Sequence, residues 1–330
     1  MTIDHMPALS ICIPTFNRSA LLEEALTTLL NDISEDFAHD IEVVISDNAS
    51  TDNTQQICEK FCREYSQINW VIKRQSSSIG ADNVQYVATL AHGRYIWILS
   101  DDDLILPGAL KTLLDNIKDD YDILITNHTS FDVDPAIQSP PHFKETSDVI
   151  LKDKNEVIEY LCTMVTFLSV ICFRADLVDT NAYKFAFGSN LPQSYMFIDA
   201  IIKSRDQKLI STPILTTRRN NTGGYNVFNV FIEKFFTLLE YSGQRGVDFV
   251  TIERVKRKHL LKFLLPLVVL MKTDGVGTLT PDWVSTKGLF NKFYSSNITY
   301  RMLVMPMISA PPSVVYMLSK THKFLKGSRR

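Results

Sequence analysis

The sequence predicts an α/β fold in which a mostly parallel sheet is flanked by helices and followed by a C-terminal helical extension. Short apolar runs rich in β-branched residues alternate with stretches of helical hydrophobic spacing over the first 131 residues. Each run is followed by a polar loop, as at the carboxyl ends of strands in open α/β sheets. Beyond this part the helical patterns dominate. We therefore expect one domain over 1–225 and a mainly helical region over 226–330.

Length and composition fit a folded globular protein, with 330 residues, 45% hydrophobic and 22% charged. The 34 Lys and Arg residues nearly balance the 37 Asp and Glu residues, so the net charge of −3 does not favour a nucleic-acid partner. Five cysteines, several of them within apolar runs, predict free thiols in a reducing cytoplasm. The start of the chain is short and polar, so no signal peptide is expected. The longest apolar segment, 260–271, is shorter than the roughly 20 residues that span a bilayer.

The first predicted strand begins at residue 8 and is expected to break at Pro14. A polar loop, Thr15–Arg18, then leads into a helix with leucines at helical spacing. The loop has no G-x-G-x-x-G pattern, which argues against a dinucleotide-binding Rossmann domain. It also lacks an aspartate at the strand end, which argues against phosphatases that place a nucleophile there.

The second predicted strand, Ile41–Ile45, runs directly into Asp47 and Asn48. Asp47 at the carboxyl end of a strand is placed for ligand binding, whereas Asp52 is placed to cap the helix that follows. A third strand over 70–75 leads into a loop with Gly80 and Asn83, and then into a helix that ends at Gly93. Strand and helix therefore continue to alternate.

The fourth predicted strand ends in Ser100 and three consecutive carboxylates, Asp101, Asp102 and Asp103. Adjacent like charges between two apolar segments repel each other unless a cation lies among them. Carboxylate oxygens suit Mn²⁺ or Mg²⁺ carrying a phosphate-containing substrate. The other interpretation is a solvated acidic turn that caps the next helix. That helix, 107–117, and a fifth strand, 121–131, complete the predicted alternation.

Four segments, IPTFNR, VVISDNASTDNT, IGADN and GRYIWILSDDDLILPGAL, together resemble family 2 glycosyltransferases of the GT-A fold, a Rossmann-like α/β fold. The resemblance covers the first 130 residues and looks closest to bacterial enzymes that build O-antigen, capsule or related surface polysaccharides. It implies transfer of a sugar from a nucleotide-diphosphate donor to a hydroxyl of a saccharide or lipid-linked saccharide acceptor. It also implies Mn²⁺ or Mg²⁺ as cofactor and inversion at the anomeric carbon.

The resemblance further implies a nucleotide-sugar site formed by the loops after the first three strands: Pro14, Thr15, Asn17, Arg18, Asp47, Asn48, Gly80 and Asn83. Asp47 would hydrogen-bond the base ring, and Asn83 would lie near the base or ribose. In the acidic triplet Asp101 would face the ribose, and Asp103 with Asp102 would hold the metal. Asp101 and Asp102 would thus complete the nucleotide-sugar site.

The general base is harder to place. Relatives of this kind usually carry it in a Glu-Asp pair about a hundred residues beyond the triplet, where this chain has Gln193 and Ser194. The nearest acid is Asp199, which is either the base or a helix-surface acid. Asp132 and Asp134, after the fifth strand, remain alternative bases.

Two further features each have two interpretations. Arg218 and Arg219 either clamp the diphosphate from a loop hinged at Gly223–Gly224 or are solvated basic residues. The segments 253–272 and 300–330 combine apolar faces with basic ends. They either rest on an anionic membrane surface or form a subdomain packed on the sheet. We expect a cytoplasmic location. Under the membrane interpretation, the protein attaches peripherally to the inner face of the cell membrane.

Two rival functions share this fold. Because the acidic pair is missing, the chain is alternatively a catalytically silent nucleotide-sugar-binding or scaffold protein. An enzyme that makes nucleotide sugars by nucleotidyl transfer would need a Gly-rich, Arg-containing loop after the first strand, and IPTFNR does not supply one.

Overall fold

The computed structural model describes residues 6–219, 226–273 and 281–327, with side chains described as far as Ser319. The chain divides into two compact units. Unit 1 comprises Met1–Arg219 with Arg245–Val247, and unit 2 comprises Asn220–Gln244 with Asp248–Arg330. The domain boundary expected at 225/226 falls beside residues 220–225, which lie outside the described residues.

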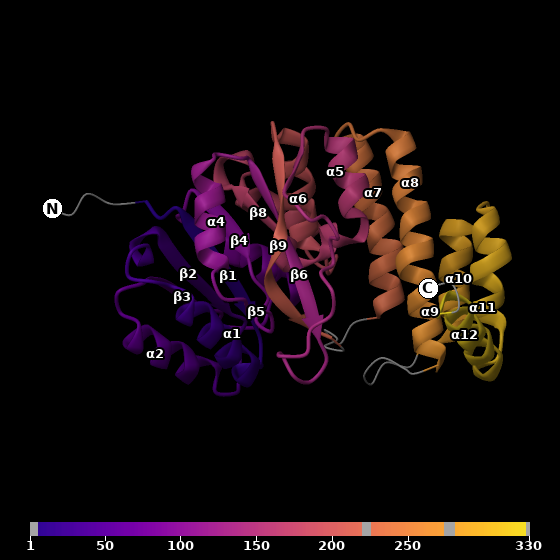
Figure 1. The fold of residues 1–330 in the computed structure, drawn as a ribbon, viewed down its shortest axis with the longest axis horizontal. Helices are drawn as coiled ribbons and strands as arrows, with labels where there is room; N and C mark the ends of the chain where they lie inside the picture. The colour runs from indigo at the N-terminus through magenta and orange to yellow at the C-terminus, as the bar shows by residue number, and fades with distance from the viewer. Residues whose placement is uncertain (1–5, 220–225, 274–280, 328–330) are drawn as a thin grey trace. The chain divides into compact units, whose positions relative to one another are not determined.

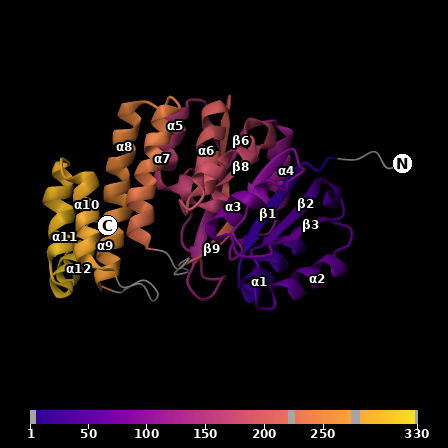
Figure 2. The same cartoon turned by 180° about the vertical axis from the view of Figure 1, so that it is seen from behind.

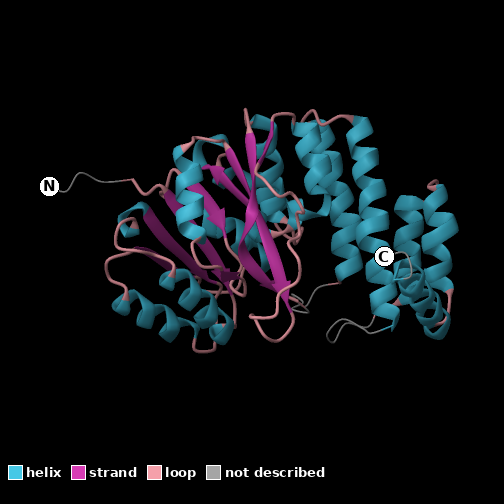
Figure 3. Cartoon of the chain, in the orientation of Figure 1, coloured by secondary structure: helices cyan, strands magenta, loops and turns pink. Residues whose placement is uncertain are grey.

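Unit 1 is built on a sheet in which nine strands are described, in the order β3-β2-β1-β4-β8-β6-β9-β5, with β7 paired to β9 (Figure 1, Figure 3). The bounds of the strands are β1 Leu9–Thr15, β2 Ile41–Asp47, β3 Asn69–Arg74, β4 Tyr95–Ile98, β5 Leu104–Ile105, β6 Ile123–Phe131, β7 Val149–Leu151, β8 Ile171–Arg174 and β9 Gln207–Arg218. All five predicted strands are present.

The first four strands in the order, β3 to β4, pair in parallel, and so do β6 and β9. Strand β8, which the sequence pattern does not reveal, runs antiparallel between β4 and β6. The predicted break at Pro14 is wrong, because β1 continues to Thr15. Strand β4 pairs with β1 only as far as Cys12, so Pro14 stands where one side of β1 has no paired strand, a position that tolerates proline.

Helices cover both faces of this sheet. Their bounds are α1 Ser19–Asn31, α2 Thr54–Glu64, α3 Asn83–Ala88, α4 Ala109–Lys118, α5 Lys154–Leu161 and α6 Pro192–Lys203. Helices α1, α2 and α4 pack on one face, and α3 and α6 lie against the other, which faces the viewer in Figure 2. The alternation of side chains along each strand supplies both faces with apolar residues.

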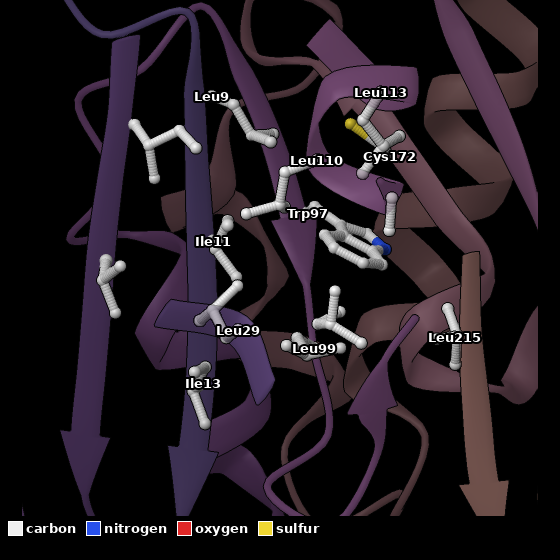
Figure 4. Close-up of a cluster of buried hydrophobic side chains, with 14 of the residues drawn as sticks. Leu9, Ile11, Ile13, Leu29, Trp97, Leu99, Leu110, Leu113, Cys172 and Leu215 are labelled. Carbon is white, nitrogen blue, oxygen red and sulfur yellow. The ribbon is translucent and has the colours of Figure 1, made fainter. Parts of the chain in front are cut away.

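The core of unit 1 is centred on Trp97 of β4. Its indole is fully buried and donates a hydrogen bond to the carbonyl oxygen of Ser169 at 2.9 Å. Ile11 of β1, Leu29 of α1 and Leu110 of α4 belong to the same buried cluster (Figure 4). All five cysteines are free thiols, as the sequence predicts. This packing fixes the strand ends that carry the polar loops.

Unit 2 is helical and has its own core. The bounds of its helices are α7 Phe235–Gln244, α8 Phe249–His259, α9 Leu265–Thr273, α10 Trp283–Tyr294, α11 Met305–Ser309 and α12 Pro312–Gly327, with π-helical turns over Asn229–Lys234, Leu260–Leu264 and Tyr300–Val304. The core is rich in aromatic rings, and those of Phe290 and Tyr300 stack at 5.8 Å between centroids. Within the described ranges, every helix is too short or too polar to cross a bilayer.

Candidate functional site

The register of the parallel strands aligns their polar carboxyl ends. Thr15 at the end of β1 pairs with Asp47 of β2, and Asp47 pairs with Arg74 of β3. On the other side of β1, Ile98 is paired with Cys12, and the amide of Leu99 donates to the carbonyl of Cys12 at 2.9 Å. The acidic triplet that follows therefore lies at the same edge of the sheet as Thr15 and Asp47.

Arg18 forms an ion pair with the triplet at this edge of the sheet. Its Nη1 donates a hydrogen bond to Oδ1 of Asp101 at 2.8 Å and lies 3.9 Å from Oδ2 of Asp102. The sequence placed Arg18 in the nucleotide-sugar site without indicating this partner. The charge of the triplet is therefore partly neutralised by a side chain of the protein itself.

The three carboxylates have different surroundings. The side chain of Asp102 is 12% exposed and that of Asp101 is 5% exposed. Burial raises the pKa of Asp101 to about 6, the Arg18 guanidinium opposes this rise, and the Asp102 carboxylate adds to it. The hydroxyl of Ser100 donates to Oδ1 of Asp102. Asp102 is thus the most open member of the triplet.

Asp103 faces inward. The hydroxyl of Ser169 donates to its Oδ2 at 2.6 Å, and that same hydroxyl oxygen accepts from the amide of Ser100 at 3.0 Å. Burial raises the pKa of Asp103 well above its usual range, and Asp102 adds to the rise. The assignment of Asp103 as a metal ligand stays a prediction, and it requires a deprotonated carboxylate.

The donor set fits a divalent cation held mainly by the substrate. Over the described ranges, no group of three or more His, Cys, Asp or Glu side chains is arranged to hold a metal ion by itself. Mg²⁺ and Mn²⁺ are, however, commonly bound by one or two carboxylates together with substrate phosphates. Asp102, whose side chain is the most exposed of the three, fits that arrangement better than Asp103, which is 2% exposed.

Asp47 offers an unused acceptor at the neighbouring strand end. Its Oδ1 accepts from the amide of Ser50 at 2.9 Å, while its Oδ2 is buried without a hydrogen bond and lies 3.5 Å from Nε of Arg74. Asn48 joins this loop to the next one, because its side chain accepts from the amide of Ile79 at 2.7 Å and donates to the carbonyl of Gly80 at 3.1 Å. The structure therefore brings Asp47, Asn48 and Gly80 together.

Asn83 is buried behind these loops. Its amide nitrogen donates to the carbonyl of Ser46 at 2.8 Å, and its amide oxygen accepts from the Ser46 hydroxyl at 2.6 Å. Both ends of the side chain are therefore bonded to β2. A contact between Asn83 and the base or ribose stays a prediction.

The start of α6 holds the residues that replace the expected acidic pair. Gln193 and Ser194 are buried there, and the amide nitrogen of Gln193 donates to the carbonyl of Thr166 at 2.9 Å. Asp199 lies about 9 Å further along the helix, given a rise of 1.5 Å per residue. It is 6% exposed and accepts a hydrogen bond from the Tyr183 hydroxyl at 2.9 Å. The interpretation of Asp199 as a surface acid is therefore wrong, and its role as base stays a prediction.

The basic pair at the end of β9 is engaged with neighbours. Arg219 donates from Nε to the Ser130 hydroxyl at 2.8 Å and lies 3.5 Å from Asp132. Arg218 pairs with Glu24, and its guanidinium stacks 4.7 Å from the ring centroid of Phe131. The proposed hinge at Gly223–Gly224 lies outside the described residues.

Ser169 is the site residue that sequence reasoning missed. It lies two residues before the antiparallel strand β8, and the short apolar run Val170–Phe173 is the local signal for a strand there. Its partner Asp103 is 66 positions earlier in the chain. The contact therefore depends on strand order rather than on local pattern.

Comparisons with known proteins agree with this geometry. The sequence profile described as "Glycosyl transferase family 2" matches residues 10–177. The chain is 35% identical over 135 residues to abequosyltransferase RfbV of Salmonella typhimurium, covering 41% of this chain and 40% of that protein. It is 33% identical over 116 residues to a GalNAc(5)-diNAcBac-PP-undecaprenol beta-1,3-glucosyltransferase of Campylobacter jejuni, covering 35% and 36%. These matches span well under two thirds of the length of either relative.

Solved structures share the fold. S. aureus TarS 1–349 in complex with UDP-GlcNAc aligns with a TM-score of 0.60 and 18% identity, covering 87% of this chain and 81% of that one. The mannosyltransferase PcManGT of Pyrobaculum calidifontis, in complex with GDP-Man and Mn²⁺, aligns with a TM-score of 0.51 and 15% identity over 96% and 89%. At such identities the likeness establishes a common GT-A architecture.

Proposed function

Since this chain belongs to glycosyl transferase family 2, we propose that it moves a sugar from a nucleotide-diphosphate donor to a hydroxyl of a saccharide or lipid-linked saccharide acceptor. We propose bacterial surface polysaccharide synthesis as its setting, because the two bacterial relatives are an abequosyltransferase and a glucosyltransferase named for a PP-undecaprenol-linked saccharide. The observation that carries the proposal is the alignment of Asp47 and the acidic triplet at one edge of the sheet. That edge presents an acceptor for a base and carboxylates for a metal-bound diphosphate.

Each group at this edge has a role in donor binding. Oδ2 of Asp47, which has no hydrogen bond in the structure, accepts an N–H of the base, and the Gly80 loop, joined to it through Asn48, closes the nucleotide pocket. Asp101 faces the ribose and Asp102 holds Mn²⁺ or Mg²⁺ together with the donor phosphates. The cation stabilises the negative charge that develops on the leaving diphosphate.

The acceptor hydroxyl attacks the anomeric carbon from the opposite face, which inverts its configuration and requires a proton acceptor. We propose Asp199 as that base, with Asp132 as the rival. The two sites differ in exposure: Asp199 is buried beside Tyr183, whereas Asp132 is exposed beside Arg219. The variant Asp199→Asn is expected to lower kcat without changing donor affinity. A fall of this kind in Asp132→Asn instead would move the role to Asp132.

We also propose that unit 2 docks on an anionic membrane surface, where a lipid-linked acceptor lies. Residues 283–330 contain eight Lys and Arg residues and no Asp or Glu. The helical stretch that includes Tyr300, Val304 and Ile308 buries those three side chains and exposes Met302 and Leu303 on its other side. Exposed apolar side chains on a segment rich in Lys and Arg suit the interface of anionic lipids.

Helix α12 carries further exposed apolar side chains. It buries Val315 but exposes four large side chains, those of Val314, Tyr316, Met317 and Leu318. We expect full-length protein to co-sediment with vesicles of phosphatidylcholine and phosphatidylglycerol, and less so as salt is raised. The double variant Met302→Glu/Met317→Glu should lose this binding, whereas Phe249→Glu, an equally exposed apolar position on α8, should keep it. Equal binding by wild type and the double variant would remove the membrane proposal.

The alternative, a silent nucleotide-sugar-binding protein, is favoured by the absence of acids at Gln193 and Ser194. Turnover of a panel of sugar nucleotides with Mn²⁺, with and without saccharide acceptors, separates the two. The enzyme proposal expects donor hydrolysis or transfer that Asp102→Asn reduces at least a hundredfold. Tight nucleotide binding without turnover of any donor would favour the silent protein.

A further inference from the structure

The two residues that flank Arg18 in the sequence fix the position of its backbone. Asn17, with a left-handed φ of 52°, donates its amide to the Ser50 hydroxyl at 2.8 Å and accepts from the amide of Thr51 at 2.7 Å. On the other side, the amide of Ser19 donates to Asp52 at 2.9 Å. The backbone of Arg18 is therefore tied to the loop after β2. With the backbone fixed in this way, the guanidinium lies beside the triplet, although the side chain is 29% exposed.

This placement puts a fixed positive charge beside the most exposed carboxylate of the triplet. The guanidinium lies 3.9 Å from Oδ2 of Asp102 while bonding Oδ1 of Asp101 at 2.8 Å. A divalent cation bound to Asp102 would stand within a few ångströms of that charge and be repelled by it. A metal ion without a diphosphate therefore encounters a site whose negative charge is already partly neutralised by Arg18.

A diphosphate reverses this balance. Its oxygens bring negative charge to the cation and also accept hydrogen bonds from a guanidinium. When metal and diphosphate bind together, Asp102 contacts the metal and Arg18 donates hydrogen bonds to the diphosphate. Metal alone would be attracted by Asp102 and repelled by Arg18. We propose that Arg18 keeps Mn²⁺ or Mg²⁺ off Asp102 until the ion arrives with the diphosphate of the donor, so that metal and donor bind as one complex. This inference rests on the proposed function.

The test measures binding of Mn²⁺ alone to the full-length protein, by the electron paramagnetic resonance signal of free Mn²⁺. Removal of the charge in Arg18→Gln should tighten Mn²⁺ binding at least tenfold over wild type. Arg18→Lys keeps the charge and should stay within about threefold of wild type. Arg18→Met serves in place of the glutamine variant if that variant does not show a wild-type unfolding transition.

Arg74→Gln is the matched control. Arg74 is also a partly exposed arginine at this edge of the sheet, but it lies 3.5 Å from Asp47 and is not paired with the triplet. Its loss should leave Mn²⁺ affinity unchanged. The double variant Arg18→Gln/Asp102→Asn should lose the tightening, which places the gained ion at Asp102.

Three results would overturn the inference: unchanged or weaker Mn²⁺ binding in Arg18→Gln, an equal gain in Arg74→Gln, or a gain that survives Asp102→Asn. A purely structural Arg18–Asp101 ion pair would give the first of these and lower only the stability. Failure of the proposed function has a separate signature, because no sugar nucleotide would then stabilise the wild type. The Mn²⁺ measurement needs no donor and is independent of that outcome.

Discussion

The strongest prediction concerns which carboxylate of the triplet holds the metal. Asp103 is buried, has a pKa raised well above its usual range, and accepts a hydrogen bond from Ser169. Asparagine has the same shape and is neutral, and its side-chain oxygen still accepts from Ser169. We therefore expect Asp103→Asn to lower the free energy of unfolding by less than about 1 kcal/mol.

Ser169→Ala gives the contrasting magnitude. It removes the hydrogen bond to Asp103 and leaves the amide of Ser100 without its acceptor. Each buried group left unsatisfied costs about 1–3 kcal/mol, so the loss for the two groups should be about 2–6 kcal/mol. For a domain of this size that corresponds to a fall in Tm of roughly 4–24 °C.

The assay is thermal unfolding followed by circular dichroism, with and without Mn²⁺ and a stabilising nucleotide. Asp103→Asn should keep the metal-dependent rise in Tm, and Asp102→Asn should lose it. The reasoning is refuted if Asp103→Asn abolishes that rise while Asp102→Asn keeps it. It is also refuted if Asp103→Asn is more destabilising than Ser169→Ala.

The remaining predictions concern the two cores. Trp97→Ala should cost about 3–5 kcal/mol in urea unfolding, because it empties the centre of the unit 1 core, and a loss below 1 kcal/mol would contradict that role. Gly93→Ala should cost about 1–3 kcal/mol, since a Cβ there would lie 2.7 Å from the amide nitrogen of Ser10, whereas Gly288→Ala, with nothing within 4 Å, should cost nothing. Burial lowers the pKa of His259 to about 4, so below pH 6.5 the unfolded chain binds more protons than the folded chain. The free energy of unfolding therefore decreases as the pH is lowered. Between pH 7 and pH 5 we expect a loss of about 2 kcal/mol that is absent in His259→Gln.

Local sequence pattern predicted the strands that end in polar loops. A short apolar run followed by a polar turn is a local signal, so β2, β4 and their loops were placed correctly, as was β1 except for its end at Thr15. Parallel strands expose their carboxyl ends together, and Asp47 and the triplet therefore meet at one edge of the sheet.

Contacts between distant segments were not predictable in this way. Ser169 reaches Asp103 only because β8 inserts antiparallel beside β4, a pairing that depends on strand order. Arg18 meets Asp101 across 83 positions, and nothing in IPTFNR distinguishes a guanidinium that binds a carboxylate from one that binds phosphate. Three identical neighbours, Asp101 to Asp103, carry no local sign of which faces inward. Burial decides their roles.

The central claim is that the edge formed by Asp47 and the triplet binds a nucleotide-diphosphate sugar with a divalent cation. The most direct measurement is the thermal shift of the full-length protein with UDP-, CDP-, GDP- and dTDP-sugars, each with and without Mn²⁺. We predict that the sugar nucleotides of one base raise the Tm several-fold more than those of the other bases, and only in the presence of Mn²⁺. Asp102→Asn should lose this rise in Tm. No stabilisation by any of these ligands, or an equal shift in Asp102→Asn, would contradict the account.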